Sequence, residues 1–376
     1  TFVTVMPHDP FQFEVNEAYV ATSRNLAPVQ FAVGRKLEHW SQIDEVWKLG
    51  IWQPRFSWDP LNPDAAAMTG ATLSVQQPGF KVTAFATPLF IPERGVGLSV
   101  ANGTVRSNTP WVSTPPVNMA FFGQNTPFQY EIAMPAITKV LFNPAASGLA
   151  RFGGDTGFWG QLGYAYKPLN QIIMGYDGGL GITGVANATI FPRVMYHHLV
   201  SGEAAYSSKE LDVSISTLAE VPVRDATPST WSTQEVTPSV AAGLTAEWRP
   251  NPTLTKLKGS YLLQTGGNAP DQGPLASNGQ SLFGYRYPFQ NALILETDVS
   301  PIRFAGGGLM IHSKVTYDLI HQGLIISPQV KLAIFNSLLF GLGLDLLASG
   351  GDGSSPDFVR SNLGNSRVYS GVNYVF

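Results

Sequence analysis

Apolar and polar side chains alternate with a period of two residues along much of the chain. Between positions 338 and 347, leucine or phenylalanine occupies one parity, while the other carries glycine, leucine and an aspartate. The stretches 309–319 and 324–334 follow the same rule, with His, Lys, Asp, Ser and Gln on the second parity. Because neighbouring side chains of a β-strand point to opposite faces, each stretch predicts a strand with one apolar and one mostly polar face.

These three strands have about eleven residues each, which is the length that a tilted strand needs to cross a bilayer. In 281–299 the alternation places Tyr287 and Phe289 on the apolar parity, with the aromatics at one end, as expected where a strand enters an aromatic girdle. With the other alternating stretches, we expect about sixteen strands, within a range of about fourteen to eighteen. Those stretches lie at 15–23, 29–36, 70–76, 80–90, 130–142, 158–167, 210–216, 239–248 and 256–264.

Composition favours a membrane sheet over a soluble one. Charged residues make up only 13% of the chain, about half of the usual share, which is too few for the solvated outer faces of a large sandwich. The chain lacks the run of roughly 18 apolar residues that a membrane helix needs. In hydrocarbon every backbone polar group must pair within the protein, so a sheet there must close on itself. We therefore predict an all-β fold, a transmembrane antiparallel up-and-down β-barrel that comprises residues 1–376 as one domain. A soluble β-sandwich or propeller is the alternative.

The connections between the strands differ in length. Counted back from the C-terminus, mostly tight turns fall on one side and long polar loops on the other, which is typical of a meander whose two ends face different surroundings. The intervals 37–69 and 91–127 lack the two-residue period, and by this count both would lie on the short-turn side. We expect 37–69 to be a constriction or plug folded into the lumen, and 91–127 to be a long loop.

The C-terminal stretch RVYSGVNYVF places valine or an aromatic at alternate positions. It resembles the C-terminal signature of Gram-negative outer-membrane β-barrel proteins, the porin-like superfamily, and the strand pattern over 158–376 supports the same resemblance. The resemblance implies a bacterial outer-membrane location, with the terminal aromatic at the periplasmic interface. It also implies that the barrel assembly machinery reads Val372, Tyr374 and Phe376, and that outer-membrane lipid and lipopolysaccharide surround the wall.

The polar parity is the predicted wall of a water-filled lumen, because about sixteen strands enclose more space than side chains can fill. Charges of both signs on this parity would set a transverse field and a modest ion selectivity. Alternatively, they pair with one another and stiffen the wall. The predicted pore-lining residues are Arg193, Lys256, Lys258, Arg286, Glu296, Asp298, His312, Lys314, Asp318, Lys331 and Asp345.

The most distinctive stretch is 35–63, which combines four tryptophans with charges of both signs. Ser41 followed by Asp44 resembles a helix start, so we expect a short helix over 42–49. Folded into the lumen, this stretch would bury its aromatics and set a constriction lined with charges of both signs. Flat aromatic faces edged by such charges would also suit sugar rings. The alternative is a structural plug or a loop at the rim. The predicted constriction residues are Glu38, Asp44, Glu45, Lys48, Arg55, Asp59, Trp47 and Trp52.

A barrel enzyme is the least favoured alternative. The chain has no G-x-S-x-G or H-E-x-x-H pattern, and adjacent His197 and His198 would point to opposite faces of a strand rather than share a metal. A net charge of −3 gives no sign of a nucleic-acid partner, and the lack of cysteine excludes disulfides and thiolate metal sites. We expect no catalytic residue, no metal and no cofactor.

We predict an outer-membrane channel for ions or small polar solutes, with sugars among the candidates. Two other functions stay open, an interaction barrel with an occluded lumen and a polysaccharide exporter. The sequence decides neither the transported solute nor the formation of a homo-oligomer.

Overall fold

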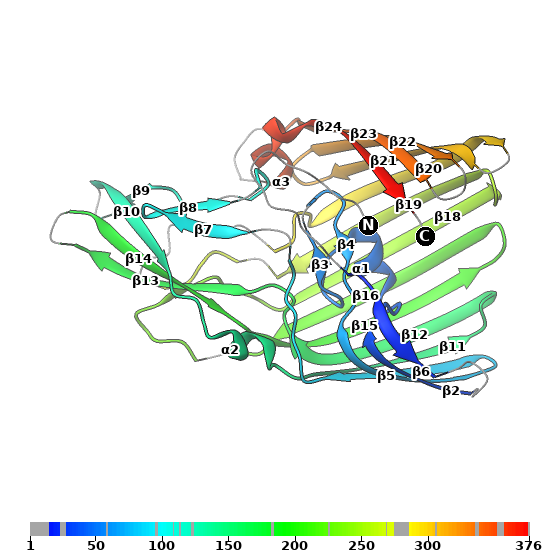
Figure 1. Ribbon diagram of the computed structural model, residues 1–376, viewed down its shortest axis with the longest axis horizontal. Coiled ribbons are helices and arrows are strands. Elements are labelled where there is room, and N and C mark those ends of the chain that lie inside the picture. Colours follow the sequence, from blue (N-terminus) through cyan, green and yellow to red (C-terminus); the bar gives the residue numbers. More distant parts are fainter. Residues whose placement is uncertain are drawn as a thin grey trace.

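The computed structural model describes residues 15–22, 28–57, 59–94, 97–107, 109–112, 114–121, 124–181, 184–224, 226–267, 269–273, 286–304, 307–334, 338–351 and 357–374. Its dominant element is an antiparallel sheet of fifteen strands that curves into a barrel wall (Figure 1). Each strand pairs with the next wall strand along the chain, from β1 to β24, and no pairing between these two end strands is found in the described ranges.

The predicted all-β, up-and-down architecture is confirmed, and fifteen wall strands lie within the predicted range. The wall strands are β1 (Ala18–Ala21), β2 (Val29–Arg35), β5 (Thr69–Gln77), β6 (Phe80–Thr87), β11 (Ala145–Gly153), β12 (Gly157–Pro168), β15 (Tyr196–Ser207), β16 (Leu211–Pro222), β18 (Ser239–Asn251), β19 (Thr255–Gly266), β20 (Asn291–Phe304), β21 (Gly307–Asp318), β22 (Gly323–Ile334), β23 (Leu338–Ser349) and β24 (Arg367–Tyr374).

The two faces of the wall differ as the alternation predicts. Large apolar side chains such as Leu162, Leu295 and Leu342 point outward and are exposed, whereas Ser214 and Ser260, on the other parity, are buried inside the curve. The apolar parity is therefore the outer face. Among the described residues, no helix is long and apolar enough to cross a membrane.

The connections alternate in length around the wall. Tight turns at one end join β5 to β6, β11 to β12, β15 to β16 and β18 to β19. The intervals 37–69 and 91–127 both lie in connections at the opposite end, between β2 and β5 and between β6 and β11. The predicted placement of these intervals on the short-turn side is wrong.

One predicted wall strand belongs to another sheet. The predicted wall strand at 130–142 is β10 (Gln124–Ile132), followed by α2 (Ile137–Leu141), and the wall strand of this region is β11. β10 belongs to a second sheet in the order β17-β13-β14-β10-β9. Alternation shows that a strand has a buried and an exposed face, but not which sheet it joins, so the period at 130–142 did not distinguish a strand of this second sheet from a wall strand.

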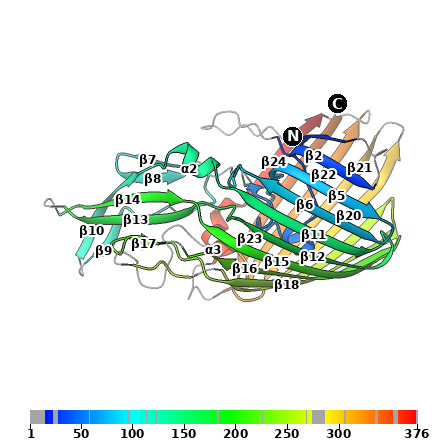
Figure 2. The same ribbon diagram turned by 90° about the horizontal axis from the view of Figure 1, so that it is seen from below.

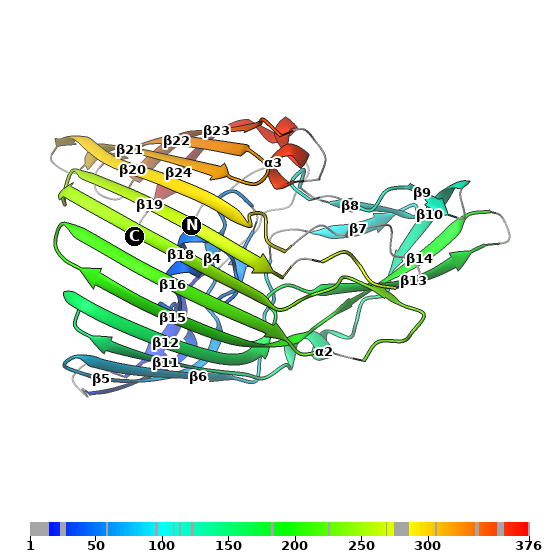
Figure 3. The same ribbon diagram turned by 180° about the vertical axis from the view of Figure 1, so that it is seen from behind.

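This second sheet projects beyond the long-connection end of the wall (Figures 2 and 3). It contains β9 (Asn118–Phe121), β10, β13 (Ile173–Leu180), β14 (Ala186–Arg193) and β17 (Ser232–Thr233), with β10 and β14 parallel. The hairpin of β7 (Leu98–Ala101) and β8 (Thr104–Ser107) packs on it through a core that includes Val105, Phe128 and Ile190. The interval 91–127, predicted as a long loop, thus holds three short strands, because part of its sequence pairs and packs within this projecting sheet.

Residues 36–68, the inner segment, connect β2 to β5 and lie within the curve of the wall (Figures 1 and 3). The segment carries α1 (Gln42–Trp47), β3 (Arg55–Phe56) and β4 (Asp64–Ala65). The predicted helix is present but ends two residues early, because Lys48 adopts the left-handed conformation with φ of 52°. Near the C-terminus, α3 (Phe358–Ser361) and a 3-10 turn (Leu363–Asn365) precede β24.

Candidate functional site

The inner segment packs on the inner face of the wall through its tryptophans. Trp40 stacks on Trp52, with ring centroids 5.0 Å apart, and meets the edge of Phe85 in β6. Trp47 donates its indole N–H to Ser260 Oγ in β19 at 3.0 Å. All three tryptophans are buried and share one core with wall residues of the strands from β6 to β20. The predicted constriction residues Trp47 and Trp52 therefore hold the segment to the wall.

Two glycines of the wall allow this close approach. A Cβ at Gly243 would lie 2.8 Å from Ile43 Cδ1, and a Cβ at Gly163 would lie 3.0 Å from Trp52 Cζ2. Only glycine leaves room at such positions without moving the segment. The glycines on the inner parity of β12 and β18 thus mark where the helix and Trp52 rest.

Asp44 organises the segment from within. Its carboxylate is buried and accepts the backbone N–H groups of Ile51 at 3.0 Å and Trp52 at 2.8 Å. Burial raises the pKa of Asp44, although these two hydrogen bonds oppose the shift. In this structure Asp44 closes the turn that follows α1 and does not line an open passage.

Ion pairs hold the start of the segment. Glu38 pairs with Lys36 and with Lys81 of β6. His39 contacts Glu45 at 2.7 Å and Glu203 of β15 at 3.7 Å. Burial lowers the pKa of His39, but the hydrogen bonds and charges of the two glutamates outweigh burial and raise this pKa to about 10.

Further charges tie the segment to other elements. Arg55 pairs with Glu93 at 2.9 Å and donates to the carbonyl of Lys48 at 2.7 Å. Asp59 pairs with Arg367 of β24 at 2.6 Å, and Arg367 also contacts Asp345 of β23 at 2.7 Å. Two predicted groups, Asp59 of the constriction and Asp345 of the pore lining, therefore meet on one arginine of the last strand.

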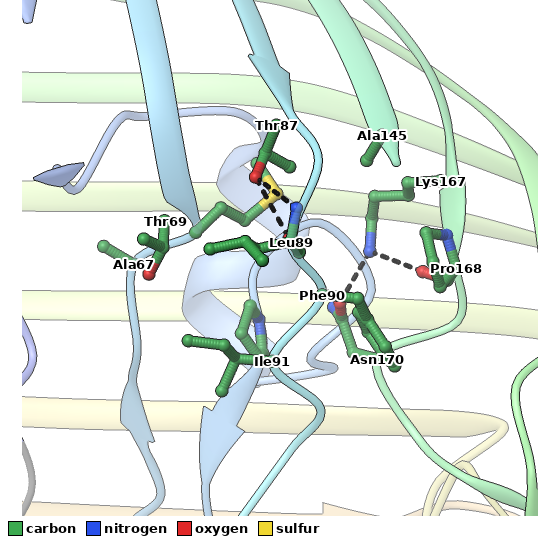
Figure 4. A pocket seen from close by; sticks show the side chains of 12 residues that line it. Ala67, Thr69, Thr87, Leu89, Phe90, Ile91, Ala145, Lys167, Pro168 and Asn170 are labelled. Atoms are coloured by element: carbon green, nitrogen blue, oxygen red, sulfur yellow. Dashed lines mark hydrogen bonds between the residues drawn. The ribbon is translucent and has the colours of Figure 1, made fainter. Parts of the chain in front are cut away.

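A small pocket marks the joint between the segment and β12 (Figure 4). Lys167 donates to Asn170 Oδ1 at 2.6 Å and to the Pro168 carbonyl at 3.2 Å, and Asn170 donates to the Ile51 carbonyl at 3.0 Å. The free volume is about 20 Å³, room for about one water molecule. The segment and the end of β12 therefore meet with little free space at this joint.

Glu220, at the long-connection end of β16, joins several elements. It is fully buried, and its carboxylate accepts two bonds from Arg286 at 2.9 and 3.0 Å and one from the Tyr287 hydroxyl at 2.7 Å. His197 Nδ1 lies 2.6 Å from it. The network anchors residues 286–289 inside the curve of the wall. Parity arguments could have placed Glu220 and His197 on the inner face, but not their contact with Arg286.

This anchoring corrects the predicted strand at 281–299. The strand, β20, begins at Asn291. Tyr287 is buried, and Phe289 meets Trp47 edge to face at 6.4 Å. Neither residue faces outward as predicted, because the Glu220 network holds the chain before β20 within the lumen, and Arg286 lies in a connection rather than on a wall strand.

The remaining predicted pore-lining charges form rows across neighbouring strands. Lys258 pairs with Glu296 at 3.2 Å, and Asp298 pairs with His312 at 2.7 Å. In the register, Glu296 also stands opposite Lys314. Lys256 pairs with Glu247 at 3.0 Å. These residues, with Lys331 of β22, make up the charged part of the inner face.

Two predicted pore-lining residues do not belong to these rows. Arg193 ends β14 of the projecting sheet and is not on the barrel wall. Its position on the polar side of an alternating strand led to the prediction, but strands of the wall and of the projecting sheet show the same alternation. Asp318 is buried at the end of β21, where it contacts His321 at 2.8 Å.

The predicted assembly signal lies in and after β24. Val372 is exposed on the outer face opposite Phe340, and Tyr374 pairs with Leu338 at the end of the strand. Phe376 lies outside the described residues. The end of β24 is at the short-turn end of the wall, since the preceding connection is a long one.

No protein-family model matches the chain, and no curated protein matches it. Among solved structures, the chain is similar to the crystal structure of Pseudomonas aeruginosa OccK9 (OpdG), with 10% identical residues and a TM-score of 0.39. The match covers 92% of this chain and 72% of that chain. So low a similarity adds no argument about function. The antiparallel up-and-down β-sheet with an apolar outer face, predicted from the alternation, is confirmed by the strand order, the register and the exposed apolar side chains.

Proposed function

We propose that the protein is an outer-membrane channel that passes ions or small polar solutes along the charged part of its inner face, over β18–β22. The observation that carries the proposal is the accessibility of these charges. The side chains of Lys256, Asp298 and His312 keep 42%, 47% and 31% of their exposure inside the curve of an apolar-faced wall. Charges at these positions need water, so this part of the lumen is wet.

The orientation follows from the connections. Barrels of bacterial outer membranes have short periplasmic turns and longer external loops. The projecting sheet would then stand outside the cell, and the end of β24 would lie at the periplasmic side. Recognition of Val372, Tyr374 and Phe376 by the assembly machinery, and contacts with lipid and lipopolysaccharide, belong to the same proposal.

The solute is best described as an ion or small polar molecule. Sugar binding by the inner segment would need open aromatic faces, but Trp40, Trp47 and Trp52 are buried against the wall. The charged rows of the inner face place positive and negative side chains next to each other, as in the pair of Lys258 and Glu296. A path along such rows favours polar solutes, with a weak preference between cations and anions.

Conductance in planar bilayers tests the proposal. The purified full chain should form channels, and a variant in which a short Gly-Ser linker replaces residues 37–68 should conduct several times more. Trp52→Ala is the milder companion variant, because it loosens the segment without shortening the chain. If neither variant nor the full chain conducts under any condition, the channel proposal is wrong.

An occluded interaction barrel is the second candidate function. It is favoured by the amount of lumen that the inner segment and residues 286–289 fill, and by the sheet that projects from the long-connection end. This candidate predicts conductance only after the segment is removed. The same bilayer experiment therefore separates the two candidates.

A further inference from the structure

Three large apolar side chains around α2 are exposed. Met134, Ile137 and Phe142 keep 76%, 71% and 62% of their surface accessible, and none of the residues in α2 is buried. These fractions match or exceed that of Leu342 on the outer face of the wall, which is 57%. Adjacent exposed apolar side chains on this scale indicate a contact surface rather than a water-facing one.

The helix is held at the rim of the wall. Asn143 Nδ2 donates to the carbonyls of Lys139 at 2.8 Å and Val140 at 2.9 Å, which caps the C-terminal end of α2. The Leu141 carbonyl accepts the N–H of Phe90 at 2.8 Å. β11 begins at Ala145, so α2 lies where the chain passes from the projecting sheet into the wall (Figures 1 and 2).

The adjoining part of the outer face carries aromatic rings with polar atoms. The ring centroid of Tyr166 lies 5.1 Å from that of Tyr196 and 5.0 Å from that of His198. The Tyr164 hydroxyl forms a hydrogen bond of 2.9 Å with His198 Nδ1. Such rings are typical of the level at which a membrane protein leaves the hydrocarbon. The Tyr196 hydroxyl also donates to the Pro144 carbonyl at 3.1 Å. The aromatic group and α2 are therefore one continuous surface at the long-connection end.

We propose that residues 134–142 form an interfacial anchor, in which Met134, Ile137 and Phe142 insert among lipid acyl chains just below the headgroups of the outer leaflet. Exposed Lys139 of the same helix suits the phosphate groups of the lipid. A second copy of the chain is a poorer occupant, because three side chains fall well short of the roughly 800 Å² per partner that a stable interface buries. The inference rests on the membrane location that is part of the proposed function.

A single labelled cysteine tests the anchor, since the chain has no cysteine of its own. Ile137→Cys, carrying an environment-sensitive fluorophore, is reconstituted into vesicles that contain lipids spin-labelled near the headgroup or deep in the acyl chain. Leu342→Cys on the wall is the membrane control, and Val117→Cys, exposed before β9 of the projecting sheet, is the water control. We expect blue-shifted emission at position 137 and severalfold stronger quenching by the shallow label than by the deep one.

The outcomes separate the anchor from the proposed function. If the probe at 137 behaves like the one at 117 while the probe at 342 is quenched, the anchor is wrong and the membrane wall stands. If the probe at 342 is also unquenched, the membrane location fails, and the anchor fails with it. Self-quenching at 137 that requires a second labelled copy, without lipid quenching, would assign the surface to a protein contact and overturn the anchor.

Discussion

Two parts of the inner face of the wall have different surroundings, one packed against protein and the other lined with charged side chains. Toward the long-connection end, from β6 to β20, the face is covered by the inner segment, and the shared core includes Leu199, Leu218 and Leu262. Nearer the short-turn end, on β18–β22, the face carries partly exposed ion pairs such as that of Lys258 and Glu296. The strand period is identical in both parts, so the period does not decide whether an inner face is dry or wet.

The difference comes from the inner side chains themselves. In the covered part, the inner parity includes alanine, leucine and glycine, as at Ala241 and Gly243 of β18. Such residues cannot solvate a lumen, but they leave room for an apolar segment to pack. Where the inward-facing side chains of a barrel strand are small or apolar, another segment of the chain should therefore be expected to cover them.

The largest effect should come from Glu220→Ala, which removes the link between the covered part and residues 286–289. Arg286 would lose its buried carboxylate, and breaking a buried ion pair costs about 3 to 5 kcal/mol. Urea unfolding of the protein in detergent or vesicles measures the loss. Asp298→Asn, which weakens an exposed pair of the wet part, is the control and should cost less than about 1 kcal/mol. Equal losses would mean that the two parts do not differ in burial.

The next largest effect on stability concerns the outer face of the wall, whose apolar side chains are proposed to meet lipid. Leu342→Arg should lower the free energy of unfolding by about 2 to 4 kcal/mol in a bilayer, because it places a charge in hydrocarbon near mid-wall. The same unfolding assay in vesicles measures this loss. A change near zero would show that the outer face of β23 meets water.

A smaller effect on stability, but a clear one on conduction, should follow Lys331→Gln on the wet part. The free energy of unfolding should change by less than about 0.5 kcal/mol. Loss of a positive charge from the lumen should shift the reversal potential in a salt gradient toward cation preference. A stability loss as large as that of Leu342→Arg would mean that the two faces of the wall are misassigned.

The smallest effect should be the pH dependence of the contact between His39 and the wall, because the His39 side chain is 36% exposed and water screens its ion pairs. The pKa of His39 is raised from 6.5 to about 10 in the folded protein, so its stabilising contribution is complete below pH 6.5 and declines as the pH rises toward 10. Unfolding free energies of the native protein and of His39→Gln, measured across this range, should converge as the pH increases. A difference that grows with pH would contradict the assigned contacts with Glu45 and Glu203.

The sequence predicted the faces of the wall better than its interior. Leu342 lies outside and Lys258 inside, as alternation requires. The inner segment was recognised by its loss of the two-residue period, and Trp47 and Trp52 are buried, as expected for aromatics folded into the lumen. The Glu220 network was not predicted, because its partners Arg286 and Tyr287 are more than sixty residues away in the chain.

Local geometry explains what the sequence determined by itself. Alternate side chains of a strand face opposite sides whatever the strand pairs with, so the period is sufficient to identify strands and to tell which side chains share a face. Only the tertiary structure decided that β10 and Arg193 belong to a projecting sheet and that 37–69 enters from the long-connection end. Strand pairing and lumen filling depend on contacts between distant parts of the chain, and a two-residue period contains no information about those contacts.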